Sequence, residues 1–230
     1  MRPSSPRAVK MSRFWRAAIA TALYAAMGRE RVNLGFAGAA AITNDGAIRY
    51  VITPRPEQPT TIGELDGGRS QRIAAIASTL ERAGFPASIC ANTVAWLKTH
   101  VAKILPTAGA LFYTGGHAAQ LARNREVLRL MARAIREGLE VLRANGVPIT
   151  PSNHRVLQWL PESLIVFIIK RMFSGETIAI KVGHVEHAHH ELQPLAQEFR
   201  GLNAATRHPT PAMDRLFEHL ASTAAHDLAS

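Results

Sequence analysis

The spacing of hydrophobic positions along this chain changes near Gly68. Before it, over residues 31–65, apolar and polar side chains alternate in short runs, which is the pattern of β-strands. After it, apolar residues recur every three or four positions, which places them on one face of a helix. The change predicts a short strand-rich segment over about residues 30–65 and an all-helical body after it.

The helical part can be divided at residues that typically start or stop helices. Gly84 is a C-terminal stop for a first helix, and Asn92 can cap a second helix that runs to Leu105. Asn145 and Gly146 end a long amphipathic helix. The remaining pattern predicts a short extended piece at residues 86–90 and further helices over residues 155–173, 184–204 and 211–228.

Two interpretations of the N-terminal region remain open. Basic residues are followed by an alanine-rich run at 17–27, which has the length of the apolar region of a short signal peptide. The run also fits a helix that ends at Gly28. We favour the helix, because residues 29–31 lead directly into a strand, and we expect residues 1–17 to form a basic tail.

No apolar run approaches the roughly 20 residues that span a bilayer, so we expect no membrane partner. The longest run, residues 164–169, is expected to be a core helix segment. The single cysteine, Cys90, excludes a disulfide framework and a cysteine-based zinc site, and a reducing, cytoplasmic setting is expected. The net charge of +10 suits an anionic partner, but no aromatic-interleaved basic stripe occurs, so nucleic acid is not expected.

Several segments, in their order and spacing, carry a resemblance to a known family. They are residues 28–36, residues 61–64 (Thr-Ile-Gly-Glu), residues 96–98 (Trp-Leu-Lys), residues 137–146, and His190-Glu191 followed by Thr210-Pro211. With these segments the chain resembles the ketopantoate reductase family over residues 18–230. The resemblance implies a mainly α fold. An all-helical domain like the C-terminal domain of 6-phosphogluconate dehydrogenase, at 67–230, would bind substrate and dimerise, after a small remnant of a Rossmann α/β domain at 18–66.

The same resemblance implies roles for two residues. Lys98 would be the catalytic lysine, which protonates the ketone oxygen of a 2-keto acid while NADPH delivers hydride, and Glu191 would hold substrate hydroxyl groups. The alternative for each is a solvated side chain on a helix surface. The family's substrate-binding asparagines and serine fall at Ala102, Pro106 and Ala179, and apolar residues cannot replace buried polar recognition. A more apolar 2-keto acid or ketone is therefore expected as substrate, or else a site that is silent.

The glycine fingerprint of a nucleotide site, G-x-G-x-x-G between a strand and a helix, does not occur in these 230 residues. We therefore expect a divergent family member that lacks most of the Rossmann domain and whose NADPH site is largely absent. The alternative function is a non-catalytic helical interaction or dimerisation module from a truncated gene. A homo-oligomer is expected under either interpretation.

A cluster of histidines gives a third, weaker hypothesis. His184 and His187 lie three residues apart, and His187 and Glu191 share a helical face at a spacing of four, which can bind zinc. The H-E-x-x-H pattern of zinc proteases is absent, and the resemblance already accounts for this helix. We expect no metal.

Overall fold

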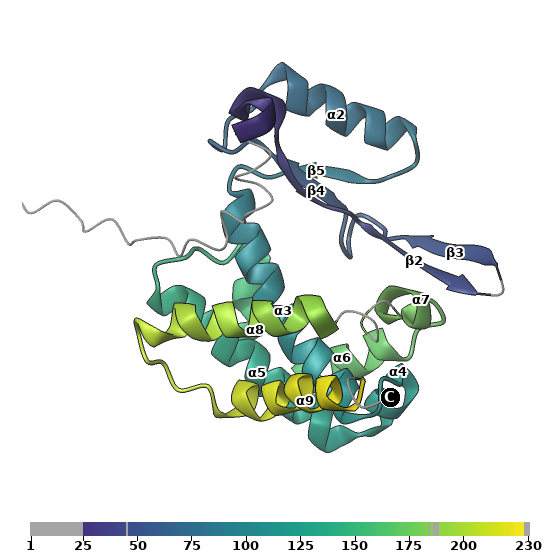
Figure 1. Cartoon of the computed structure of the whole chain (residues 1–230), viewed down its shortest axis with the longest axis vertical. Helices are drawn as coiled ribbons and strands as arrows, with labels where there is room; N and C mark the ends of the chain where they lie inside the picture. Colours follow the sequence, from purple (N-terminus) through teal and green to yellow (C-terminus); the bar gives the residue numbers. More distant parts are fainter. Residues whose placement is uncertain (1–24, 45, 184, 186–188, 228–230) are drawn as a thin grey trace, which may run out of the picture.

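The computed structural model describes residues 25–227 apart from residues 45, 184 and 186–188. The described chain forms two layers, a small sheet layer and a larger helical body, joined through α3 (Figure 1). The prediction of a mainly helical protein with a small sheet is confirmed. Among the described residues, no helix is long and apolar enough to cross a membrane.

The sheet layer contains one three-stranded sheet and one hairpin. Its elements are η1 (Arg29–Arg31), β1 (Leu34–Phe36), β2 (Ala39–Asn44), β3 (Ala47–Ile52), β4 (Thr60–Gly63), α2 (Gln71–Arg82) and β5 (Ala87–Ile89). The sheet order is β1-β4-β5, with β1 antiparallel and β5 parallel to β4. β2 pairs with β3 in a separate hairpin whose outer side exposes Ile48 and Tyr50.

α2 connects the parallel strands β4 and β5, because a parallel pair needs a crossover that a short turn cannot provide. The change to helical spacing at residue 68 therefore marks this crossover helix, and the sheet layer continues to Ile89. The all-helical domain expected at 67–230 therefore includes the strand β5. It coincides with the short extended piece predicted at 86–90. The division of the chain into domains at 66 and 67 stays a prediction.

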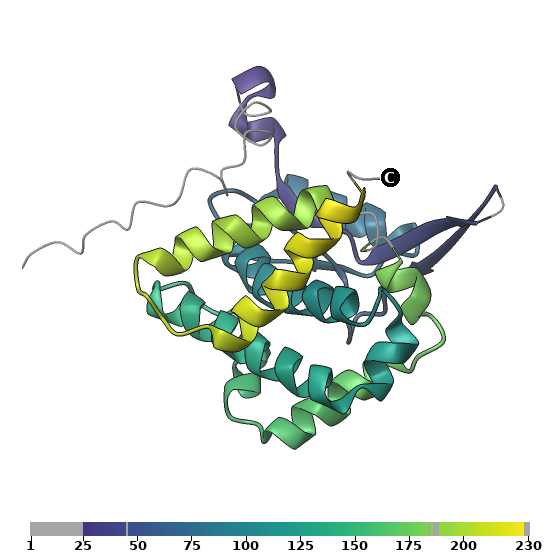
Figure 2. The ribbon, with the colours of Figure 1, turned by 60° about the horizontal axis from the view of Figure 1, so that its bottom comes forward.

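The helical body has α3, α5 and α9 at its centre. Its elements are α3 (Thr93–Tyr113), α4 (Ala118–Arg123), α5 (Arg125–Ala144), η2 (Ser152–Gln158), α6 (Glu162–Phe173), α7 (Ile178–Val182), α8 (His189–Ala204) and α9 (Pro211–Asp227). Figure 2 shows α8 and α9 crossing one side of this body and α6 at its far edge. Leucines from all three central helices, including Leu105, Leu139 and Leu216, belong to one cluster of buried hydrophobic side chains.

Two glycines allow these central helices to approach closely. Gly109 of α3 lies against the backbone of Leu216 in α9, where a Cβ atom would meet the carbonyl oxygen at 2.7 Å. Gly138 of α5 lies against Ala102 of α3, where a Cβ atom would meet the carbonyl oxygen at 2.9 Å. Both distances are shorter than van der Waals contact, so neither position has room for a side chain.

Several predicted helix boundaries are confirmed. The side chain of Asn92 caps α3 by accepting a hydrogen bond from Ala95 N at 3.0 Å, and α2 and α5 end before Gly84 and Gly146, both of which have positive φ. Residues 25–27 are helical and end at Gly28, which also has positive φ. The rest of the run at 17–27 and the tail at 1–17 lie outside the described residues.

Other boundaries differ from the prediction. α3 continues through Pro106 to Tyr113 rather than stopping at Leu105, because both halves are held in the core. The helix predicted at 155–173 is divided at Pro161 into η2 and α6, since proline cannot donate the backbone hydrogen bond that a continuous helix needs there. α7 was not predicted. The run at 164–169 is only half a core segment, because Leu164, Phe167 and Ile168 are exposed.

Candidate active site

α3 is the element that positions Lys98. The helix starts at its Asn92 cap, and the neighbours of Lys98 at Ala95 and Ala102 are buried, which fixes the turn that carries the lysine. Lys98 is half-buried, and this burial lowers the pKa of its amino group. The negative charge of Glu198 on α8 acts in the opposite direction and partly restores that pKa. Lys98 and Glu198 are thus an electrostatically coupled pair across α3 and α8.

Glu198 is a residue that sequence reasoning missed. We assigned the site carboxylate to Glu191, which lies in the first turn of α8 and is exposed. The two glutamates are seven residues apart, so they share one face of the helix. That spacing was the available signal, but it could not show which turn of α8 lies near Lys98. Among the described interactions, the charge of Glu198 raises the pKa of Lys98, whereas Glu191 does not contribute to that pKa shift.

The positions of the family's other polar residues fall in two different places. Ala102 and Pro106 are buried in the centre of the helical body, so they are core positions in this chain. Ala179 lies on α7 and lines an open cavity of about 700 Å³ between α4, α6 and α7. Three basic residues, His117, Arg123 and Lys170, and one acidic residue, Glu176, also line it. Lys98 does not line this cavity, so the structure separates the lysine from the position of the family's serine.

A second group of basic residues lies on another face of α3. The His100 ring stacks on the Trp96 ring with centroids 5.3 Å apart and contacts the Phe36 ring of β1 at 4.3 Å. Lys103 Nζ lies 3.4 Å from His154 Nε2 of η2. Burial lowers the pKa of both histidines to about 4 and that of Lys103 to about 8. The group packs where the sheet layer meets the helical body, and no sequence motif indicated it.

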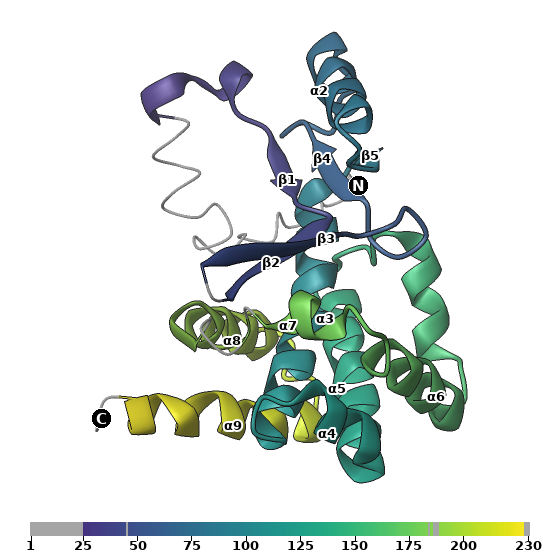
Figure 3. The same cartoon turned by 90° about the vertical axis from the view of Figure 1, so that its right-hand side faces the viewer.

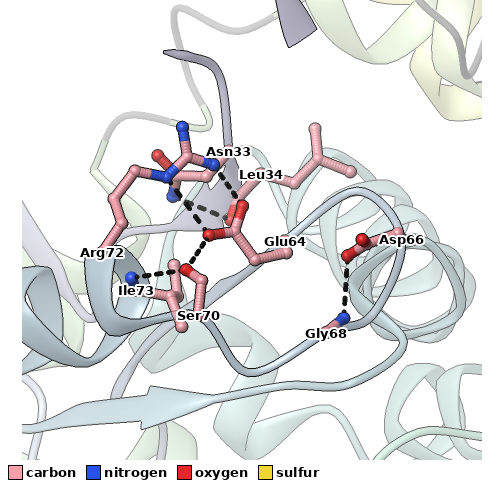
Figure 4. Close-up of polar contacts among 8 residues, drawn as sticks. All are labelled: Asn33, Leu34, Glu64, Asp66, Gly68, Ser70, Arg72 and Ile73. Atoms are coloured by element: carbon pink, nitrogen blue, oxygen red, sulfur yellow. Dashed lines mark hydrogen bonds and ion pairs between the residues drawn. The ribbon is translucent and has the colours of Figure 1, made fainter. Parts of the chain in front are cut away.

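The Thr-Ile-Gly-Glu segment, which carries part of the resemblance, has a structural role here. β4 ends at Gly63, and the Glu64 carboxylate that follows accepts hydrogen bonds from Arg72 Nε at 3.2 Å and from the Ser70 hydroxyl (Figure 4). The Ser70 hydroxyl also accepts a hydrogen bond from Ile73 N at 3.1 Å, which caps α2. The paired Arg72 and the Ser70 hydrogen bond lower the pKa of Glu64, so this carboxylate is charged at neutral pH.

This arrangement bears on nucleotide binding. A dinucleotide places its pyrophosphate at the N-terminus of the helix in a strand–turn–helix unit, against free backbone N–H groups. The parallel unit that the structure describes is β4–α2–β5, and its helix N-terminus is already capped by Ser70 with the Glu64 carboxylate beside it. Ser70 thus already occupies Ile73 N, one of the N–H groups that a pyrophosphate would use, and Glu64 is paired with Arg72 beside it. This helix N-terminus therefore does not offer the open, glycine-rich turn that holds NADPH.

Of the three candidate zinc ligands, Glu191 alone lies among the described residues. His184 and His187 lie outside the described residues, and Glu191, the third candidate ligand, is exposed. Within the described part of the chain, no group of three or more His, Cys, Asp or Glu side chains is arranged to hold a metal ion.

Comparison with known proteins gives one structural likeness. No protein-family model matches the chain, and no curated protein matches it. The structure is similar to a crystal structure described as a putative ketopantoate reductase from Ralstonia solanacearum MolK2, with a TM-score of 0.58 and 18% sequence identity. The match covers 89% of this chain and 58% of the Ralstonia chain. At this identity the likeness shows a shared fold, and this chain spans less than two thirds of that protein's length.

Proposed function

We propose that this chain is the substrate-binding part of a 2-keto acid reductase of the ketopantoate reductase type, in which Lys98 protonates the ketone oxygen. The observation that carries the proposal is the half-buried Lys98, coupled to Glu198, on the helix that the resemblance identifies as catalytic. The shared fold supports it. The role of Lys98 itself rests on the resemblance at residues 96–98.

The environment of Lys98 suits a proton donor. Reduction of a ketone develops negative charge on its oxygen, and a positioned ammonium group can neutralise that charge by giving up a proton. Burial lowers the pKa of Lys98, which makes the proton easier to release, while Glu198 keeps the amino group protonated before substrate binds. Glu198 is thus a positioning residue in this proposal, and Glu191 keeps the substrate-binding role that the resemblance implies.

The substrate class follows from the residues that replace the family's polar groups. Ala179, at the position of the family's serine, offers no side-chain hydrogen bond, and Ala102 and Pro106 are buried in the core, so a 2-keto acid with an apolar side chain suits this chain better than ketopantoate. NADPH is the hydride donor that the resemblance implies. The described residues do not fit it, so the proposal gives this chain substrate binding and proton donation alone.

The proposal is tested by titrating the chain with ketopantoate, 2-oxoisovalerate and pyruvate and following NMR shifts. We expect saturable binding, tightest for 2-oxoisovalerate. Lys98→Ala should weaken it at least about tenfold, the scale of one charge-assisted hydrogen bond. Arg82→Ala, which removes an exposed basic side chain on α2 outside the cavity between α4, α6 and α7, is the control and should leave the affinity unchanged. Binding that is equally tight in Lys98→Ala would rule out the role of Lys98.

A second candidate function is a non-catalytic helical interaction module. The observation that favours it is the N-terminus of α2, where Ser70 caps the helix and the β4–α2 turn lacks the glycine fingerprint of a nucleotide site. The titration separates the two functions. If none of the three 2-keto acids binds the wild-type chain, the interaction module is the better explanation of the fold.

A further inference from the structure

Lys103 lies in the middle of α3 among basic and aromatic side chains. Its Nζ atom is 3.4 Å from Nε2 of His154, and all three basic residues of the group, including His100, are half-buried. The His100 ring is held by Trp96 and by Phe36 of β1. Figure 3 shows the N-terminal part of α3 beside β1 and the rest of the helix running into the helical body. The group therefore lies at the junction of the two layers.

No acidic partner holds the proton of the Lys103 amino group. Among the described residues, no ion pair involves Lys103, His100 or His154. Burial lowers the pKa of Lys103 to about 8. Roughly a tenth of the amine is then uncharged at pH 7, against less than about 0.1% for an ordinary lysine. The uncharged amine is the nucleophilic form of a lysine.

This environment is an unfavourable one for a lysine. An apolar side chain of similar length would fill the same position without a half-buried charge. Ionisable groups with strongly shifted pKa values occur most often at functional sites, where the shift matches the group to its task. Lysines that act as nucleophiles are typically desolvated and lie next to other basic groups, and Lys103 meets both conditions.

We propose that Lys103 forms an imine with a small aldehyde or ketone and that His154 moves the protons. The uncharged Nζ attacks the carbonyl carbon, so a C–N bond forms as the C=O π bond breaks. His154 takes a proton from the nitrogen and delivers it to the oxygen, which gives a carbinolamine. The C–O bond then breaks, the oxygen leaves as water with the second proton of the nitrogen, and the C=N bond remains. Nothing is oxidised or reduced.

The hydrogen bond between the two side chains suits this proton transfer. A lysine ammonium group only donates, so Nε2 of His154 is the acceptor and the ring proton is on Nδ1. Nε2 is therefore free to take a proton from Lys103. The Nδ1 atom is buried and has no hydrogen-bond partner among the described residues, so no neighbouring carboxylate fixes the ring in another tautomer.

The Lys103 site is separate from the proton donor of the proposed function. Lys103 comes five residues after Lys98, which places it about 140° further around α3. Glu198 is coupled to Lys98, whereas Lys103 has His154 as its neighbour. The two lysines therefore face different surroundings, and each can be tested without the other.

The first test measures the reactivity of each lysine. The chain is incubated with propanal and cyanoborohydride, which reduces an imine to a stable secondary amine, and peptide mass spectrometry follows each site. At pH 7 we expect Lys103 to react at least about tenfold faster than Lys170, an exposed lysine on α6. The rate at Lys103 should rise with a midpoint near pH 8. Equal rates at the two lysines, or a midpoint above about 10, would overturn the proposal.

The second test separates proton transfer from simple cover. His154→Gln keeps an acceptor for Lys103 but cannot carry a proton, so labelling of Lys103 should slow at least about tenfold. If His154 only covers the amine, His154→Ala should expose it and speed the labelling, which would contradict the role given to His154. Circular dichroism checks that both variants fold. Lys98→Ala should leave the labelling of Lys103 unchanged, so this proposal and the proposed function fail independently.

Discussion

The amino group of Lys103 lies 3.4 Å from the Nε2 atom of His154, although both groups are basic. His100 lies close enough for its pKa to be lowered further by both of them. The Nδ1 atom of His154 is buried and has no hydrogen-bond partner among the described residues. Burial is the main cause of every pKa shift in this group, and no carboxylate in the described part of the chain offsets it. Such a group makes the stability of the fold depend on pH.

The fold should lose stability as the pH falls from about 6.5 to 4. The pKa of His100 and of His154 is about 4 in the folded chain and 6.5 when solvated, so between these values the unfolded chain binds more protons. We expect the free energy of unfolding to fall by roughly 2 to 5 kcal/mol over this window. Urea unfolding at several pH values measures it. The His100→Phe, His154→Gln double variant should flatten the curve, and an unchanged slope would contradict the assignment.

Lys103→Met should stabilise the fold at pH 7. The pKa of Lys103 is lowered from 10.5 to about 8, so at pH 7 the folded chain holds a buried charge that methionine would remove. We expect a gain of about 1 to 3 kcal/mol. Between pH 8 and 10.5 the folded wild-type chain releases this proton before the unfolded chain does. The free energy of unfolding of the wild type therefore rises with pH, and the stability difference between it and Lys103→Met should become smaller. A constant difference over that range would argue against a buried ammonium.

Gly109→Ala should destabilise the contact between α3 and α9. The added Cβ atom would meet the backbone of Leu216, which cannot move without shifting α9, and we expect a loss of about 1 to 3 kcal/mol. Gly201→Ala in α8 is the matched control, because nothing lies within 4 Å of its Cβ position. That variant should stabilise the chain by about 0.5 to 1 kcal/mol through helix propensity alone. Thermal unfolding of both variants measures the difference.

Glu137→Ala should weaken the docking of α9. The Glu137 carboxylate accepts hydrogen bonds from Ala212 N at 3.0 Å and Met213 N at 2.8 Å, so it caps the first turn of α9 from α5. Removing the Glu137 carboxylate should lower the free energy of unfolding by about 1 to 3 kcal/mol. Glu137→Gln keeps one acceptor oxygen and should lower it less. Glu126→Ala removes an exposed carboxylate 3.8 Å from Arg215 and should change stability by no more than about 0.5 kcal/mol. Equal losses in Glu137→Ala and Glu126→Ala would show that the cap contributes nothing specific.

The catalytic assignment can be tested if the DNA upstream of Met1 encodes an in-frame strand–G-x-G-x-x-G–helix unit. The longer protein should then reduce a 2-keto acid with NADPH. In it, Lys98→Ala should lower kcat by about 10²-fold or more, the scale of one positioned proton donor. With ketopantoate, Glu191→Ala should raise KM more than it lowers kcat, because Glu191 would hold substrate hydroxyl groups already bound in the ground state. A longer protein that turns over normally with alanine at 98 would refute the role of Lys98.

Local chemistry made much of the fold predictable. Asn92, Gly84 and Gly146 act within one turn of the helix that they bound, so their roles could be read from neighbouring residues. The predicted end of the second helix at Leu105 was wrong, because it too was judged from local residues. Proline disfavours a helix locally, but α3 passes through it because both halves are buried against α5 and α9.

The site was less predictable than the fold, because it depends on which helix turns meet. Glu191 and Glu198 lie on one face of α8, and sequence could not show which of them lies over Lys98. Nor could it show that His154, more than fifty positions after His100, joins the same buried basic group. Pairings of this kind are non-local, and they are set by the packing of whole helices.

The sequence by itself determined the strand-rich start, the helical spacing after it, and the absence of the glycine fingerprint, since each depends on residues near one another in the chain. Only the tertiary structure decided that Ser70 caps the N-terminus of α2 while donating a hydrogen bond to Glu64. It also decided that one apolar side of α6 is exposed. Helical spacing shows that a residue is apolar and on which face it lies. It cannot show whether another element covers that face, because the cover comes from a distant part of the chain or from another molecule.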